Sequence, residues 1–193
     1  MQLSDRMLAG TLAFIGGVEC LVGISVAEEL YPGYSVSANY ISDLGATCRA
    51  SCTVMQPASV VFNSSVAILG GLVIASSLFF YRSTQRKLLT AFLVMGGIGG
   101  LGVGFFPETT GIAHAIFSLI VFLFGGLSAI LSYQVQQFPM NYFSIVLGVV
   151  TLVALALFTS GNYAGLGPGG MERMIAYPAL LWLVGFGAYL TRS

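Results

Sequence analysis

The sequence predicts an all-α protein, a polytopic bundle of six transmembrane helices that forms a single integral membrane domain over residues 1–193. Three observations support this prediction. The first two concern composition: only 7% of the residues are charged, and 56% are hydrophobic. Soluble domains carry roughly one quarter charged residues, so most of this chain is expected to lie in lipid. The third is the length of the apolar runs, because a helix needs about 20 residues to cross a hydrocarbon core about 30 Å thick.

Six segments reach that length. None of them alternates apolar and polar residues at every second position, as the strands of a membrane barrel do, so each is predicted to be a helix. The predicted spans are 7–27, 57–81, 88–106, 111–133, 142–160 and 171–191.

The first span carries an acidic residue, Glu19, in its outer half, on the helical face that also holds Gly16 and Gly23. Small residues let helices approach closely, so this side chain is expected to face a neighbouring helix rather than lipid. Two interpretations stay open: a protonated glutamate that hydrogen-bonds across the bundle, or a proton acceptor or ligand anchor. The apolar run is longer than the core of a signal peptide, so the span is predicted to be retained.

The connection between the first two spans, residues 28–56, is long, and loops of that length usually serve a function or act as a lid. Tyr40, Ile41 and Leu44 fall at helical spacing, which predicts a short helix lying at the membrane surface over the site. Cys48 and Cys52 are spaced closely enough for a local disulfide, and the sequence leaves open whether one forms.

Lys and Arg predict the orientation of the bundle. If the amino terminus is cytoplasmic, five of the seven basic residues lie inside, among them the cluster after the second span, and only Arg49 and Arg173 lie outside. Both termini are therefore predicted to be cytoplasmic, in a multi-pass protein of the cell membrane. The formal net charge is zero, and no basic surface of the kind that binds nucleic acid is expected.

Glycines dominate the third span, where Gly96, Gly100 and Gly104 recur every four residues and predict close packing against another helix. The fourth span follows Pro-Glu-Thr-Thr, a sequence typical of a helix start, in which Glu108 would favour the helix amino terminus. His114 lies one to two turns into that helix, with Ser118 one turn further on the same face.

The sixth span begins after a predicted flexible turn of Gly and Pro at 167–170. Glu172 and Arg173 are then expected in the first helical turn, with Tyr177 one turn beyond. A cation is unfavourable at a helix amino terminus, so Arg173 is expected to have an anionic partner. The candidates are Glu19, Glu108, Asp43, a lipid phosphate and a bound substrate.

Several of these sequences together resemble a known family. They are Pro-Gly-Tyr-Ser at 32–35, which includes Tyr34 and Ser35, Tyr-Ile-Ser-Asp-Leu-Gly at 40–45, Pro-Glu at 107–108 with His114 and Ser118, Gly-Gly-Met-Glu-Arg at 169–173, Tyr-Pro at 177–178 and Leu-Leu-Trp at 180–182. The combination resembles an archaeal and bacterial family of six-helix membrane proteins known as domain of unknown function 998. A more distant similarity is to Frag1-like membrane proteins. The resemblance implies the architecture and the location of the site, but no activity.

Three functions remain open. The first is binding of a lipid head group or small amphiphile in an outward-facing polar cavity, possible catalysis included: His114 would be the general acid or base, Glu108 or Asp43 its orienting carboxylate, and Ser118 a nucleophile. In that cavity Glu19, Tyr34, Ser35, Asp43, Glu172, Arg173 and Tyr177 would contact the ligand.

The second is a proton- or ion-coupled transporter of small solutes, and the third is a structural protein without a site. No cofactor is implied, and a zinc site would need more Cys or His than the chain offers. Membrane lipids are the expected partners, together with a small amphiphilic ligand. The sequence leaves the ligand's identity and the oligomeric state open.

Overall fold

A computed structural model describes residues 4–48 and 51–192 of the chain, and within them six long helices account for nearly all of the fold. All six are long and apolar enough to cross a membrane, which confirms the predicted bundle. The helices are α1 (Asp5–Leu30), α2 (Ala58–Thr84), α3 (Lys87–Phe105), α4 (Ile112–Leu131), α5 (Met140–Thr159) and α6 (Gly167–Leu190).

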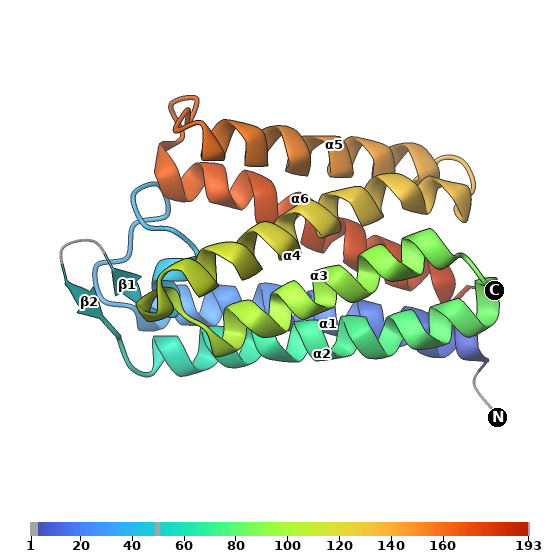
Figure 1. Ribbon diagram of the computed structural model, residues 1–193, viewed down its shortest axis with the longest axis horizontal. Helices are drawn as coiled ribbons and strands as arrows, with labels where there is room; N and C mark the ends of the chain where they lie inside the picture. The colour runs from blue at the N-terminus through green and yellow to red at the C-terminus, as the bar shows by residue number, and fades with distance from the viewer. Residues whose placement is uncertain (1–3, 49–50, 193) are drawn as a thin grey trace.

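The contacts between the helices, which Figure 1 shows from the side, close into a ring. Each packs against the next in sequence, and α1 also packs against α6, which closes the circle. The first and last helices therefore lie side by side, with both ends of the chain at one end of the bundle. The long loop between α1 and α2 covers the opposite end.

Glycines make the closest helix contacts possible. A β-carbon added to Gly10 in α1 would lie 2.6 Å from the carbonyl oxygen of Gly187 in α6, closer than real β-carbons come. The same holds between α2 and α3, where a β-carbon on Gly70 would lie 2.6 Å from the carbonyl oxygen of Gly97. The ring is thus drawn together at positions where neither helix has a side chain.

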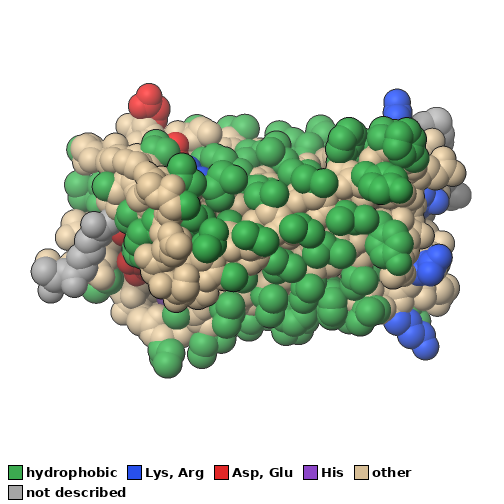
Figure 2. Space-filling model, turned by 90° about the horizontal axis from the view of Figure 1, so that it is seen from above, with side chains coloured by type: hydrophobic (Ala, Val, Ile, Leu, Met, Phe, Trp, Pro, Cys, Tyr) green, Lys and Arg blue, Asp and Glu red, His purple; other side chains and the backbone are tan. Residues whose placement is uncertain are grey.

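Charge is segregated along the bundle axis (Figure 2). In that view most Lys and Arg side chains lie at the end that holds the termini, the visible Asp and Glu side chains lie at the loop end, and a broad apolar band separates them. Bilayer-spanning proteins show this distribution because charge is excluded from hydrocarbon. The cytoplasmic location of the termini stays a prediction, and one residue used for it, Arg49, lies outside the described part of the chain.

The long loop carries the remaining regular structure. It contains the 3₁₀ helix η1 (Ser42–Leu44) and a short antiparallel hairpin of β1 (Thr47–Cys48) and β2 (Cys52–Thr53). The disulfide that the sequence left open is present between Cys48 and Cys52. Two further 3₁₀ helices, η2 (Glu108–Thr110) and η3 (Ser132–Gln134), lie next to α4.

The predicted surface helix around residues 40–44 is wrong. The helical segment is only η1, and its Asp43 and Leu44 are buried rather than lying at a surface. The reason is local, because one carboxylate oxygen of Asp43 accepts hydrogen bonds from the backbone N–H of Tyr40 and the side-chain amide of Asn39, each at 2.9 Å. The polar residue therefore turns inward and closes the loop on itself.

Candidate functional site

Arg173 is the centre of the polar contacts at the end of the bundle that the long loop covers. Its Nη1 donates to the carbonyl oxygens of Val36 at 2.9 Å and Gly169 at 3.0 Å. Its Nη2 donates to the carboxylate of Glu28 and, at 2.8 Å, to the hydroxyl of Tyr34. One buried guanidinium thus joins α6, the end of α1 and the loop.

The predicted anionic partners of Arg173 within the chain, Glu19, Glu108 and Asp43, were wrong, since its ion pair is with Glu28. The error came from helix boundaries. The sixth helix begins at Gly167, four residues earlier than predicted, so Arg173 lies in the second turn. The first helix extends to Leu30, which places Glu28 in its last turn beside α6.

Tyr34 connects the arginine to the rest of the loop. Its hydroxyl accepts from Arg173 and donates to the carbonyl oxygen of Tyr40 at 2.7 Å. Burial raises the pKa of this hydroxyl, and the hydrogen bond from Arg173 opposes that effect only in part. Ser35 closes the adjoining turn, because its backbone N–H donates a hydrogen bond to the side-chain oxygen of Asn39. Tyr177 packs against the apolar core.

Two carboxylates hold the following loop segment. Glu172 of α6 is 5% exposed and accepts a hydrogen bond from the backbone N–H of Ile41. Glu108 accepts from the hydroxyl of Ser42 at 2.7 Å with one oxygen and from the backbone N–H of Cys48 at 3.1 Å with the other. These acidic side chains fasten the loop at its middle.

His114 and Ser118 form a pair on α4. Nδ1 of His114 lies 2.8 Å from the carbonyl oxygen of Phe106, and Nε2 lies 3.3 Å from Oγ of Ser118. Because a carbonyl only accepts, Nδ1 carries the proton, and in the neutral imidazole Nε2 then accepts from the Ser118 hydroxyl. The expected orienting carboxylate is therefore replaced by a backbone carbonyl, since both oxygens of Glu108 contact the loop instead.

The placement of His114 also differs from the prediction. Pro-Glu-Thr-Thr forms the separate helix η2 rather than the start of α4, because Gly111 adopts φ +62° and interrupts the helix. The fourth helix begins at Ile112, and His114 is its third residue.

Glu19 lies apart from this cluster. It is partly buried in α1, and the glycines on its face contact α2, as predicted, through Leu72 at Gly16 and Ser65 at Gly23. One of its carboxylate oxygens is buried without a hydrogen-bond partner among the described residues.

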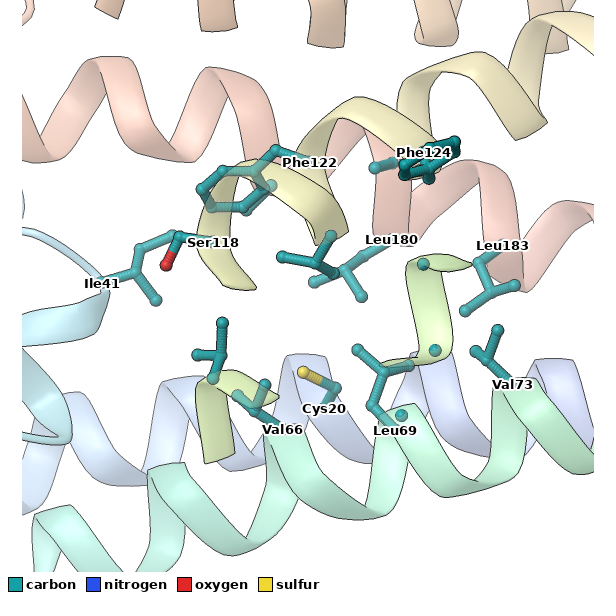
Figure 3. Close-up of a pocket in the computed structure, with 18 of the residues that line it drawn as sticks. Cys20, Ile41, Val66, Leu69, Val73, Ser118, Phe122, Phe124, Leu180 and Leu183 are labelled. Atoms are coloured by element: carbon teal, nitrogen blue, oxygen red, sulfur yellow. The ribbon is translucent and has the colours of Figure 1, made fainter. Parts of the chain in front are cut away.

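An elongated cavity of about 120 Å³ lies inside the ring, lined by η1 and by every long helix except α5. Figure 3 shows Ile41 and Ser118 at one end, Val73 and Leu183 at the other, and Cys20, Val66 and Leu69 facing Phe122 and Leu180 across it. Nearly all lining residues are apolar or glycine. The exceptions are Cys20, Ser42, Ser118, Ser128 and Glu172.

The predicted site residues thus fall into separate groups. Only Ser118 and Glu172 line the cavity, and His114 contacts it through Ser118, whereas Tyr34, Ser35, Asp43, Glu108 and Arg173 hold the loop. Sequence reasoning missed Ser42 and Ser128 as cavity residues. The Ser128 hydroxyl is buried without a hydrogen-bond partner among the described residues, and nothing in its sequence context marks it.

Within residues 4–48 and 51–192, no three His, Cys, Asp or Glu side chains lie close enough together to hold a metal ion. The arrangement is therefore an apolar cavity with a few hydroxyl groups and one carboxyl group. The long loop covers one end of it, and acidic side chains and Arg173 hold that loop in place.

Comparison with known proteins agrees with the resemblance noted from the sequence. No curated protein and no solved structure matches the chain. The more distant similarity to Frag1-like proteins and an archaeal or bacterial origin stay predictions. A family profile described as "Protein of unknown function (DUF998)" matches residues 14–189, and the chain belongs to this family of membrane proteins.

Proposed function

We propose that the protein binds an amphiphile taken from the membrane, with an apolar part of the ligand in the central cavity and its polar end beside η1. The observation that carries this proposal is the cavity itself, which is apolar along its length and has Ser42, Ser118 and Glu172 among its lining residues. A ligand with one polar end and one apolar end matches that distribution.

The size of the cavity supports occupation by an apolar group. An apolar cavity of roughly 150 Å³ in another protein binds benzene and stays free of water. At about 24 cal/mol per Å³, leaving 120 Å³ empty would cost about 3 kcal/mol of stability. A ring-sized group or a short stretch of chain would recover that free energy, while the rest of the ligand extends toward lipid.

The polar end of the ligand would lie at the outer end of the cavity. Ile41 and Ser118 are at that end in Figure 3. Ser42 follows Ile41 in the sequence, and Glu172 accepts the hydrogen bond from the backbone N–H of Ile41. The loop that carries Ile41 and Ser42 would then cover the bound head group.

Two glycine substitutions test this proposal. Gly125 lines the cavity, and a β-carbon there would find no neighbouring atom closer than 3.6 Å, so Gly125→Val should fill the cavity while the fold persists. Gly71 is the control, since a β-carbon there meets nothing within 4 Å and the residue does not line the cavity. Mass spectrometry of lipids that co-purify with the protein should find one enriched amphiphile in the wild type and in Gly71→Val, and lose it in Gly125→Val. Co-purified lipids that match the bulk membrane in all three proteins would sink the proposal.

Catalysis is the second candidate, favoured by the His114–Ser118 pair. Oγ of Ser118 would attack an ester carbonyl as its proton passes to Nε2 of His114, and the leaving alcohol would take that proton as the acyl-serine forms. Water would then release the acid and restore the serine. This function ranks second because the serine hydroxyls at the outer end, Ser42 and Ser118, already donate to Glu108 and His114 and offer no donor to an oxyanion.

A fluorophosphonate probe distinguishes catalysis from simple binding. An activated Ser118 should be labelled in the wild type, and labelling should disappear in Ser118→Ala and in His114→Gln. The matched control is Ser128→Ala, which removes another serine that lines the cavity on the same helix. Absence of labelling in the wild type would exclude the catalytic candidate and leave binding standing.

A further inference from the structure

We infer that the ligand of the central cavity is uncharged and presents a hydroxyl group, so that the protein selects neutral, hydroxyl-bearing amphiphiles over lipids with anionic head groups. This inference rests on the proposed binding function and names the chemical class of the ligand.

Charge is the first part of the argument. Among the described lining residues, Glu172 is the single ionisable acid apart from the thiol of Cys20, and no Lys, Arg or His side chain lines the cavity. A phosphate or carboxylate in the cavity would therefore find no cation among the lining residues, and burying an unpaired anion is costly.

Arg173 does not reverse this conclusion, although it follows Glu172 in the chain. Its Nη1 and Nη2 donate to the loop carbonyls, Glu28 and Tyr34, and it is not one of the residues that line the cavity. Its Nε has no hydrogen-bond partner among the described residues, but that atom is buried. The hydrogen bonds of the guanidinium are therefore committed to the loop and to Glu28 rather than to the cavity.

Hydrogen-bonding capacity is the second part. The hydroxyl hydrogen of Ser42 is donated to Glu108, and that of Ser118 is donated to Nε2 of His114. Each serine keeps oxygen lone pairs, and Oε2 of Glu172 accepts the N–H of Ile41. The outer end of the cavity thus offers acceptors and needs a ligand that donates, which an alcohol does and an ether, ester or phosphate diester does not.

Three probes that share one apolar chain separate these properties: oleyl alcohol, oleyl methyl ether and oleyl phosphate. Each is titrated against a fluorescent long-chain alcohol bound to the full-length protein in neutral detergent at neutral pH. We expect the alcohol to displace the reporter about tenfold more tightly than the ether, since one hydrogen bond is lost, and at least as much more tightly than the phosphate.

Variants locate the effect. Ser118→Ala should weaken binding of the alcohol severalfold and leave the ether unchanged. Ser83→Ala, at an exposed serine outside the cavity, should preserve the preference for the alcohol. Glu172→Gln, which retains an oxygen acceptor for the Ile41 N–H and adds an amide N–H donor, should improve binding of the phosphate relative to the wild type. Equal binding of the three probes, or preference for the phosphate, would overturn the inference while the binding function stands. If no probe binds the wild type, the binding function fails and the inference fails with it.

Discussion

The guanidinium of Arg173 forms an ion pair with the carboxylate of Glu28, and this pair ties the start of α6 to the end of α1. The two side chains are 8% and 22% exposed, so both charges are largely removed from solvent. Gly10 and Gly187 bring the same two helices together at the end of the bundle that holds the termini, and the ion pair joins them at the opposite end. The ring is therefore held at both ends of its closing interface.

Removal of one partner of this pair should destabilise the protein more than removal of a nearby exposed charge. Glu28→Gln leaves the Arg173 charge without compensation, and we expect the free energy of unfolding to fall by about 3 kcal/mol. Glu29→Gln is the control, since that side chain is exposed, and its effect should stay within about 0.5 kcal/mol. Unfolding in detergent micelles measures both, and equal effects would show that the pair contributes nothing to stability.

The contact between Glu172 and Ile41 should govern how firmly the loop is held. Glu172→Ala removes the acceptor of the Ile41 N–H, and we expect faster amide hydrogen exchange at Ile41 by a factor of about 10 or more, because an unpaired buried N–H costs about 1–3 kcal/mol. Glu172→Gln keeps an acceptor and should exchange nearly as slowly as the wild type. Unchanged exchange in the alanine variant would mean that other contacts hold the loop.

Adjacent glycines in α2 should respond oppositely to the same substitution. Gly70→Ala places a methyl group against the backbone of α3, 2.6 Å from the carbonyl oxygen of Gly97, and should lower stability by about 2 kcal/mol as the helices separate. Gly71→Ala meets nothing within 4 Å and should be neutral or slightly stabilising, since alanine favours helices. Thermal unfolding in micelles compares the two variants, and similar midpoints would contradict the close packing of α2 and α3.

Alkaline pH should weaken the loop through Tyr34. Burial raises the pKa of its hydroxyl, so the folded protein keeps the proton at a pH where the unfolded chain begins to lose it. The contribution to stability is complete below a pH of about 10, the ordinary pKa of tyrosine, and is lost as the pH rises through the raised value. The stability difference between the wild type and Tyr34→Phe should therefore shrink above that pH. Unfolding in detergent micelles, repeated over the alkaline range, measures this difference, and a difference that does not change with pH would contradict the prediction.

The membrane spans could be predicted because a helix that faces lipid needs apolar residues whatever it packs against. The start of α6 could not, since Gly-Pro-Gly-Gly is typical of a turn. In the structure Pro168 occupies the first helical turn, where its missing N–H costs nothing. Gly169 is small because the backbone of Asn39 passes against it, a contact between distant segments that no local pattern reveals.

The candidate site was predicted only as a collection of residue types at one end of the bundle. Which carboxylate meets Arg173 depends on how α1 and α6 lie against each other, and Glu28 is 145 residues away in sequence. The cavity escaped prediction for a different reason. It is a space left between side chains, and Gly125, which helps to leave it open, cannot be distinguished in sequence from Gly126, which packs tightly against Leu152.

The closed ring has a consequence for biosynthesis. The side of α1 that contains Gly10 and Gly17 is covered by α6, which leaves the ribosome after the other five helices. Until then the nascent bundle is an open arc with an uncovered glycine groove, and Glu28 has no cation beside it. A chaperone that shields this groove during insertion would bind that surface. A truncated chain without α6 would use the same surface to capture the α6 of another molecule.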